Sequence, residues 1–124
     1  MYVYLAIAVG GIFGCWARYL MTQLVQSIWG TWFPYATLII NVSGSFLMGF
    51  LFIETLERLT LPVPVRTGIL TGFLGGYTTF STYMMESLLL MEQGAILKGG
   101  TYLLLSNLFG LVAAFFGAFL ARNL

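Results

Sequence analysis

The sequence predicts an all-α integral membrane protein with four transmembrane helices, the third of them broken near its middle. The 124 residues are 60% hydrophobic and only 7% charged, whereas a soluble domain has about a quarter charged residues. Four apolar stretches approach the ~20 residues that a helix needs to cross a bilayer core. The third contains a run rich in glycine and hydroxyl side chains, Gly72–Thr82, which is expected to loosen the helix.

The four spans are separated by short connections, so we expect one transmembrane domain over residues 1–124. The first span is too long for a signal-peptide core and lacks a basic start, so we interpret it as retained. Pro62 and Pro64 indicate a turn before the third span. The predicted spans cover about residues 2–25, 34–52, 65–91 and 97–120.

Composition excludes several classes of function. The net charge is +1, which gives no electrostatic basis for binding nucleic acid. Cys15 is the only cysteine, and histidine and aspartate are absent. An intrachain disulfide, a cysteine metal cluster and a Ser-His-Asp triad are therefore impossible. The sequence indicates that the protein is not an enzyme.

The distribution of basic residues leaves the orientation open. Arg58, Arg66 and Arg122 fall on the side of the termini, and Arg18 and Lys98 fall on the other. Cytoplasmic loops normally have the excess of Lys and Arg, and three against two is hardly an excess. Either one orientation prevails, or the chain inserts both ways and forms an antiparallel homodimer. Four helices have little interior for polar groups, so an oligomer is expected in both cases.

The break predicted in Gly72–Thr82 has a chemical consequence. Backbone amides and carbonyls that leave the helical pattern cannot be satisfied by lipid. A protein interior, an ion or a water-filled path must satisfy them instead. This combination points to ion handling more than to catalysis.

Polar side chains in the second and fourth spans have two interpretations each. Asn41 lies near the middle of the second span, where an amide is costly unless it forms hydrogen bonds. It could join two helices or line a pore. Tyr102 and Ser106 lie one turn apart on one face of the fourth span. That face could line a narrow path or form a packing groove.

The half of the third span after the predicted break has an aromatic face. Phe80, Tyr83 and Glu86 are spaced by three and fall roughly on one side. Such a stripe is usually core, but the positive edges of aromatic rings favour a partly dehydrated anion. The hydroxyls of Ser81 and Thr82 could add hydrogen bonds to it.

Two charged residues inside the spans are candidates for electrostatic roles. Arg18 either snorkels to the membrane surface or raises the anion concentration in a cavity. Glu86 could pair with such a cation or tune the entry of ions.

Three motifs, in order, resemble those of the Fluc (CrcB) family of small fluoride channels. Gly11–Tyr19 is similar to the family's Gly-x-x-Gly-(small)-x-x-Arg-Tyr, and Asn41–Gly49 to its Asn-x-x-Gly-x-Phe-x-x-Gly. Gly72–Thr82 is similar to its broken third span. The resemblance extends over essentially the whole chain.

The resemblance implies a passive fluoride channel of the bacterial inner membrane, which exports cytoplasmic fluoride. It implies an antiparallel, dual-topology homodimer with two pores. Glu86 matches a vestibule glutamate, and Tyr83 departs from the family, which usually has phenylalanine there. The residues that the resemblance assigns to the anion pathway are Asn41, Phe80, Ser81, Thr82, Tyr83, Tyr102 and Ser106.

The resemblance also implies one structural sodium ion at the centre of the dimer. Its ligands would be the backbone carbonyls of Gly75 and Thr78. Carbonyl oxygens freed by a helix break suit a hard monovalent cation. No organic cofactor is expected.

Two other functions compete with this interpretation. A proton-coupled small multidrug transporter is also a four-helix antiparallel dimer, but it needs an acidic residue deep in the first span. The first span here contains Arg18 and no acidic residue. A non-conducting scaffold subunit, in which the polar stripes only pack, stays open.

Overall fold

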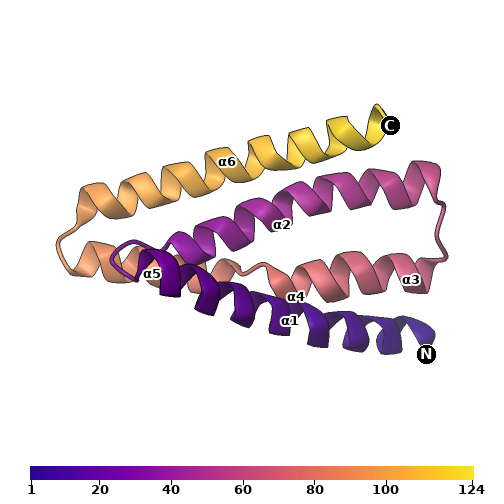
Figure 1. Cartoon of the computed structure of the whole chain (residues 1–124), viewed down its shortest axis with the longest axis horizontal. Helices are drawn as coiled ribbons and strands as arrows, with labels where there is room; N and C mark the ends of the chain where they lie inside the picture. Colours follow the sequence, from indigo (N-terminus) through magenta and orange to yellow (C-terminus); the bar gives the residue numbers. More distant parts are fainter.

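The computed structural model describes residues 1–124, and all of its regular structure is helical (Figure 1). Three helical segments are long and apolar enough to cross a membrane: α1 (Tyr2–Trp29), α2 (Tyr35–Ile53) with its continuation η1 (Glu54–Arg58), and α6 (Ile96–Arg122). The chain between η1 and α6 is built from shorter helical pieces, namely α3 (Val63–Thr67), η2 (Gly68–Leu74), α4 (Gly75–Tyr77) and α5 (Phe80–Glu92). The segments η1 and η2 are π-helical turns.

The chain runs back and forth along one axis, and both termini lie at the same end of the bundle (Figure 1). Helix α1 continues to Trp29, beyond the predicted end near residue 25, and stops at Gly30. Gly30 has φ +76°, in the left-handed region that favours glycine. The position of the two ends agrees with the expectation that both termini lie on one side of the membrane.

The predicted break is present, but it falls on two threonines and not on the glycines. Thr78 and Thr79 have extended backbones, with φ −81° and ψ 160°, and φ −149° and ψ 120°. Gly72, Gly75 and Gly76 stay helical before them. The reason is that side chains replace helical acceptors here: the Thr79 amide donates to Asn41 Oδ1 (2.9 Å), and the Thr82 amide donates to Thr79 Oγ1 (3.3 Å), which caps α5.

The glycines serve close packing between α1 and η2. A Cβ atom added to Gly10 would collide with the backbone of Gly68, and one added to Gly14 with the backbone of Phe73. Such contacts let two helices approach without side chains between them. Helix α2 packs along α6 in the same way, because Gly117 meets the backbone of Phe46.

This packing predicts the effect of adding one methyl group. Gly14→Ala should destabilise the protein by about 1–3 kcal/mol, the usual cost of overpacking, because the Phe73 backbone cannot move aside easily. The matched control is Gly11→Ala on the same helix, where the added Cβ would meet only the Gly72 carbonyl oxygen, at 3.9 Å. Thermal unfolding in detergent should show a lower midpoint for Gly14→Ala alone. Equal midpoints would contradict the packing.

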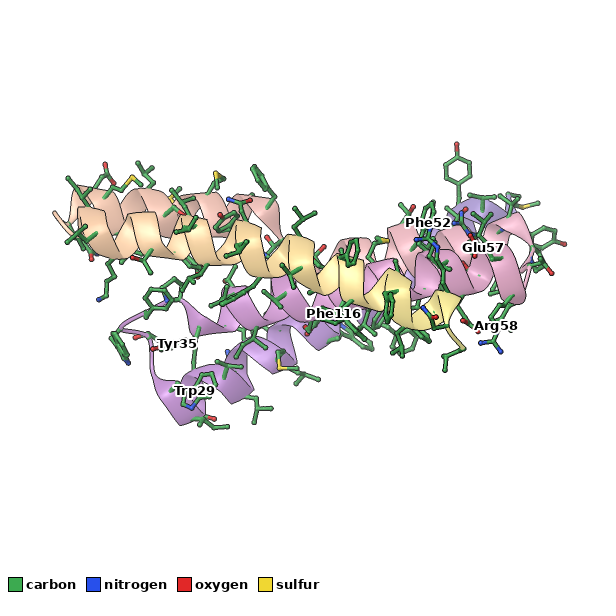
Figure 2. All side chains as sticks on the ribbon, turned by 90° about the horizontal axis from the view of Figure 1, so that it is seen from above. Trp29, Tyr35, Phe52, Glu57, Arg58 and Phe116 are labelled. Carbon is green, nitrogen blue, oxygen red and sulfur yellow. The ribbon has the colours of Figure 1, made fainter.

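Charged and aromatic side chains mark the two ends of the bundle, and Figure 2 shows Trp29 and Tyr35 at the end opposite to Arg58. Trp29 and Tyr35 pack edge to face with ring centroids 5.3 Å apart. At the other end, Arg58 pairs with Glu54 at 3.4 Å. Such rings and charges suit the two membrane–water interfaces.

Candidate functional site

A polar groove of about 480 Å³ runs beside the break, between α2, α5 and α6. Four residues that the sequence predicted for the anion pathway line it, from all three helices. Phe80 is 72% exposed, whereas Tyr83 and Ser106 are buried. The polar and aromatic residues of this groove are Asn41, Ser45, Thr78, Thr79, Phe80, Tyr83, Ser106 and Asn107.

Asn41 holds the break through two reciprocal hydrogen bonds. Its Nδ2 donates to the carbonyl oxygen of Thr79, and the Thr79 amide donates to its Oδ1, each at 2.9 Å. Both bonds form only in one orientation of the carboxamide, so the donor and acceptor ends are assigned without ambiguity. The interhelical bond that the sequence offered as one role for Asn41 is therefore present.

This arrangement leaves the pore role of Asn41 open as well. An amide nitrogen has two N–H groups, and one suffices for the bond to Thr79. Asn41 is half-buried and lines the groove. The second N–H is thus available to an ion, and the two interpretations of Asn41 are compatible.

The next residues of α2 reinforce the hold on the break. Ser43 Oγ and Tyr77 Oη share a hydrogen bond of 2.9 Å. Gly44 is buried against Thr78, whose Cγ2 methyl group occupies the space that a Cβ atom would need. Each residue from Tyr77 to Thr79 is therefore fixed by α2.

Three aromatic rings form a chain of edge-to-face contacts behind the groove. The centroids of Phe80 and Tyr83 are 6.0 Å apart, and those of Tyr83 and Tyr102 are 5.2 Å apart. The Tyr83 hydroxyl donates to the Leu103 carbonyl (3.1 Å) and accepts from Asn107 Nδ2 (3.1 Å). The Tyr83 hydroxyl, at a position where the resemblance implies phenylalanine, thus joins α5 to α6.

Removal of this hydroxyl should affect stability more than transport. We expect Tyr83→Phe to cost about 1 kcal/mol, the usual net value of a hydrogen bond, and to keep any ion flux. The ring and its edge contacts with Phe80 stay in place. Thermal unfolding and liposome flux on the same preparation check this. Loss of flux with unchanged stability would mean that the hydroxyl binds the ion.

Ser106 is the most informative polar group of the groove. Its Oγ is buried and has no hydrogen-bond partner in the chain. Gly110 and Ala114 continue the same lining with small residues. A hydroxyl buried without a partner costs about 1–3 kcal/mol, and in this groove the Ser106 hydroxyl is free to donate to a group from outside the chain.

Glu86 and Tyr102 meet at one end of the aromatic chain. The Tyr102 hydroxyl donates to Glu86 Oε1 at 2.8 Å. Glu86 also lines a second pocket of about 450 Å³, with Gln93 and Lys98. The Lys98 ammonium lies 5.3 Å from the centroid of the Trp32 ring. This pocket combines charged, polar and apolar lining residues.

The remaining predicted residues lie apart from the groove. Ser81 and Thr82 are exposed on α5 and do not line it. Arg18 is half-buried on α1, and no ion pair joins it to Glu86 within the chain. Its guanidinium approaches only Cys15 Sγ, at 4.0 Å.

Sequence reasoning missed four polar residues that line the groove, namely Thr79, Asn107, Ser45 and Thr78, the last of which was predicted only as a cation ligand. Thr79 supplies the backbone that Asn41 holds, and Asn107 supports the Tyr83 hydroxyl. The run of hydroxyls after Gly76 was a signal for the first. Asn107 follows Ser106 directly in the sequence, but no signal in the sequence connects it with Tyr83.

The fold and the groove define a class of protein: a small, multi-pass helical membrane protein with one interrupted crossing and a polar groove beside the interruption. A family model described as CrcB-like protein, Camphor Resistance (CrcB), matches residues 5–118. The chain belongs to this family.

Several curated relatives have the name fluoride-specific ion channel FluC. The protein from Acidithiobacillus ferrooxidans is 52% identical over 117 residues, which are 94% of each chain. One from Legionella pneumophila is 44% identical over 96% of this chain and 89% of its own. One from Methylococcus capsulatus is 48% identical over 96% of this chain, but this covers only 52% of its own length.

Proposed function

We propose that this protein is a passive, fluoride-selective channel that exports cytoplasmic fluoride across the bacterial inner membrane. The observation that carries the proposal is the polar groove, where a buried hydroxyl without a partner lies among aromatic rings. The names of relatives up to 52% identical support the choice of ion.

The chemistry of the groove fits a small anion that has lost part of its water. The Ser106 hydroxyl and the free N–H of Asn41 are hydrogen-bond donors, and aromatic edges are weakly positive. Donors held in place by the protein replace water at little cost in reorganisation. A narrow passage lined in this way favours fluoride over larger halides.

The functional unit that we propose is an antiparallel, dual-topology homodimer with two pores. Phe80 is an apolar side chain exposed beside a polar groove, and a second subunit would cover it. A structural sodium ion would lie at the dimer centre, held by the carbonyls of Gly75 and Thr78. When bound, this ion neutralises carbonyl dipoles and joins the two subunits.

The decisive experiment is efflux from liposomes that contain the purified protein. Vesicles loaded with potassium fluoride or potassium chloride are opened to potassium with an ionophore, and the released anion is measured with an ion-selective electrode. We expect release of fluoride and retention of chloride. Retention of both ions would refute the channel and favour a scaffold, and release of both would refute the selectivity.

Ser106 gives a further prediction with a matched control. Ser106→Ala should lower fluoride flux but keep or raise stability, because it removes an unsatisfied buried hydroxyl. Ser87→Ala should lower stability and leave fluoride flux unchanged. The Ser87 hydroxyl is equally buried but donates to the Tyr83 carbonyl at 2.8 Å, and Ser87 does not line the groove. Flux and unfolding measured on both variants test whether the Ser106 hydroxyl serves the ion.

A further inference from the structure

At the break, two backbone amides donate to side chains instead of to the carbonyls that would accept from them in a helix. In an α-helix, each N–H bonds to the carbonyl four residues earlier. The Thr79 amide would therefore serve Gly75, but it donates to Asn41 Oδ1 at 2.9 Å. The Thr82 amide would serve Thr78, but it donates to Thr79 Oγ1 at 3.3 Å. The carbonyls of Gly75 and Thr78 thus lose their helical donors.

The first of these bonds also fixes the direction of the Thr78 carbonyl. The Thr78 carbonyl and the Thr79 amide belong to one planar peptide unit, which is trans, so they point in opposite directions. The Thr79 amide points to Asn41 on α2. The Thr78 carbonyl therefore points away from α2.

The surroundings of the break leave the first carbonyl accessible. Gly75 is exposed, and a Cβ atom there would approach only the Leu70 carbonyl oxygen, at 4.0 Å. No side chain donates to either carbonyl among the hydrogen bonds of the break. Carbonyl oxygens without donors are costly in a membrane, and they are good ligands for a monovalent cation.

We propose that Asn41 and Thr79 are positioning residues for a monovalent cation. Their side chains accept hydrogen bonds from the Thr79 and Thr82 amides, respectively. These bonds free and orient the carbonyls of Gly75 and Thr78, which bind the cation. The cation belongs to the proposed function, on which this inference rests. The new element is the assignment of these two side chains. In this arrangement Asn41 serves the anion groove and the cation site at once.

The test measures the response of stability to sodium, independently of fluoride transport. The full-length protein in detergent is unfolded thermally at increasing NaCl, with choline chloride holding the ionic strength constant. Thr79→Val removes the acceptor and keeps the shape, whereas Thr79→Ser keeps the acceptor. We expect Thr79→Val to raise the half-stabilising Na+ concentration roughly tenfold, a factor equivalent to about 1.4 kcal/mol, and Thr79→Ser to leave it nearly unchanged.

A second variant removes the other acceptor. Asn41→Leu has a similar size but cannot bind the Thr79 amide, so it should weaken the response to Na+ at least as much as Thr79→Val. The control is Ser43→Ala, which lies on the same helix and loses the bonds of the Ser43 hydroxyl to Tyr77 Oη and to the Ile40 carbonyl, but neither of the bonds that free the two carbonyls. It should lower stability at all Na+ concentrations without changing the half-stabilising value.

The outcomes separate this inference from the channel itself. If Thr79→Val and Asn41→Leu respond to Na+ as the wild type does, the assignment of the two side chains is wrong. If the wild type shows no response to Na+, the cation site is wrong as well. Neither result would contradict the proposed channel function, because that function is tested separately by fluoride efflux from liposomes.

Discussion

Phe80→Ile is expected to abolish fluoride flux while leaving a folded protein. The side chain is 72% exposed beside the groove and meets Tyr83 edge to face at 6.0 Å, so little packing within the subunit depends on it. Isoleucine is apolar but has no ring edge to offer an anion. We expect flux to fall by about 100-fold or more, which corresponds to about 2.8 kcal/mol at the barrier.

Liposome efflux and size-exclusion chromatography together check this prediction. The control is Phe119→Ile on α6, a side chain that is exposed and lies outside the groove, and it should conduct normally. If Phe80→Ile conducts as well as the wild type, the aromatic edge does not contribute to the passage of the ion.

Asn41→Asp should also stop transport, for two reasons that the structure separates. A carboxylate has no donor for the Thr79 carbonyl, so one of the two 2.9 Å bonds becomes a contact between two oxygens. The charge also repels an anion in the groove at short range. We expect loss of flux by at least about 100-fold, as for a barrier raised by 2.8 kcal/mol, together with a lower unfolding temperature.

Asn41→Leu distinguishes the two causes, because it loses both hydrogen bonds without adding charge. We expect it to conduct poorly, but better than Asn41→Asp, in the same efflux assay. Normal flux through Asn41→Asp would place Asn41 outside the ion path and show that the break tolerates the lost bond.

The broad architecture follows from the sequence because hydrophobic length and the residues that interrupt it are local properties. The all-helical fold and the interruption of the helical stretch before α6 were predicted from such signals. The interruption at Thr78 and Thr79 lies inside the predicted run Gly72–Thr82, but the role of the glycines before it was not predicted, because glycine permits both a loosened backbone and close packing. In the structure, the close contact between the Phe73 backbone and Gly14 shows that the glycines allow helices to pack closely. This contact joins segments that are distant in the sequence, so no local sequence pattern predicts it.

The groove was predictable in part for the same reason. Asn41, Phe80 and Ser106 are conspicuous because a polar or aromatic residue stands out in an apolar span. The residues that bind them do not stand out in the sequence. Thr79 contributes its backbone, and Asn107 contacts Tyr83 only because α5 and α6 pack in one register. Ser81 and Thr82 have suitable chemistry but lie on the exposed side of α5.

The hold of α2 on the break has a consequence for biosynthesis. Ribosomes make proteins from the N-terminus, so α2 enters the membrane before the interrupted crossing is complete. The carboxamide of Asn41 is then already at membrane depth when the unpaired peptide group of Thr79 arrives. A circular permutant that starts at α3 would reverse this sequence of events, and it should yield less inserted protein although its final contacts are the same.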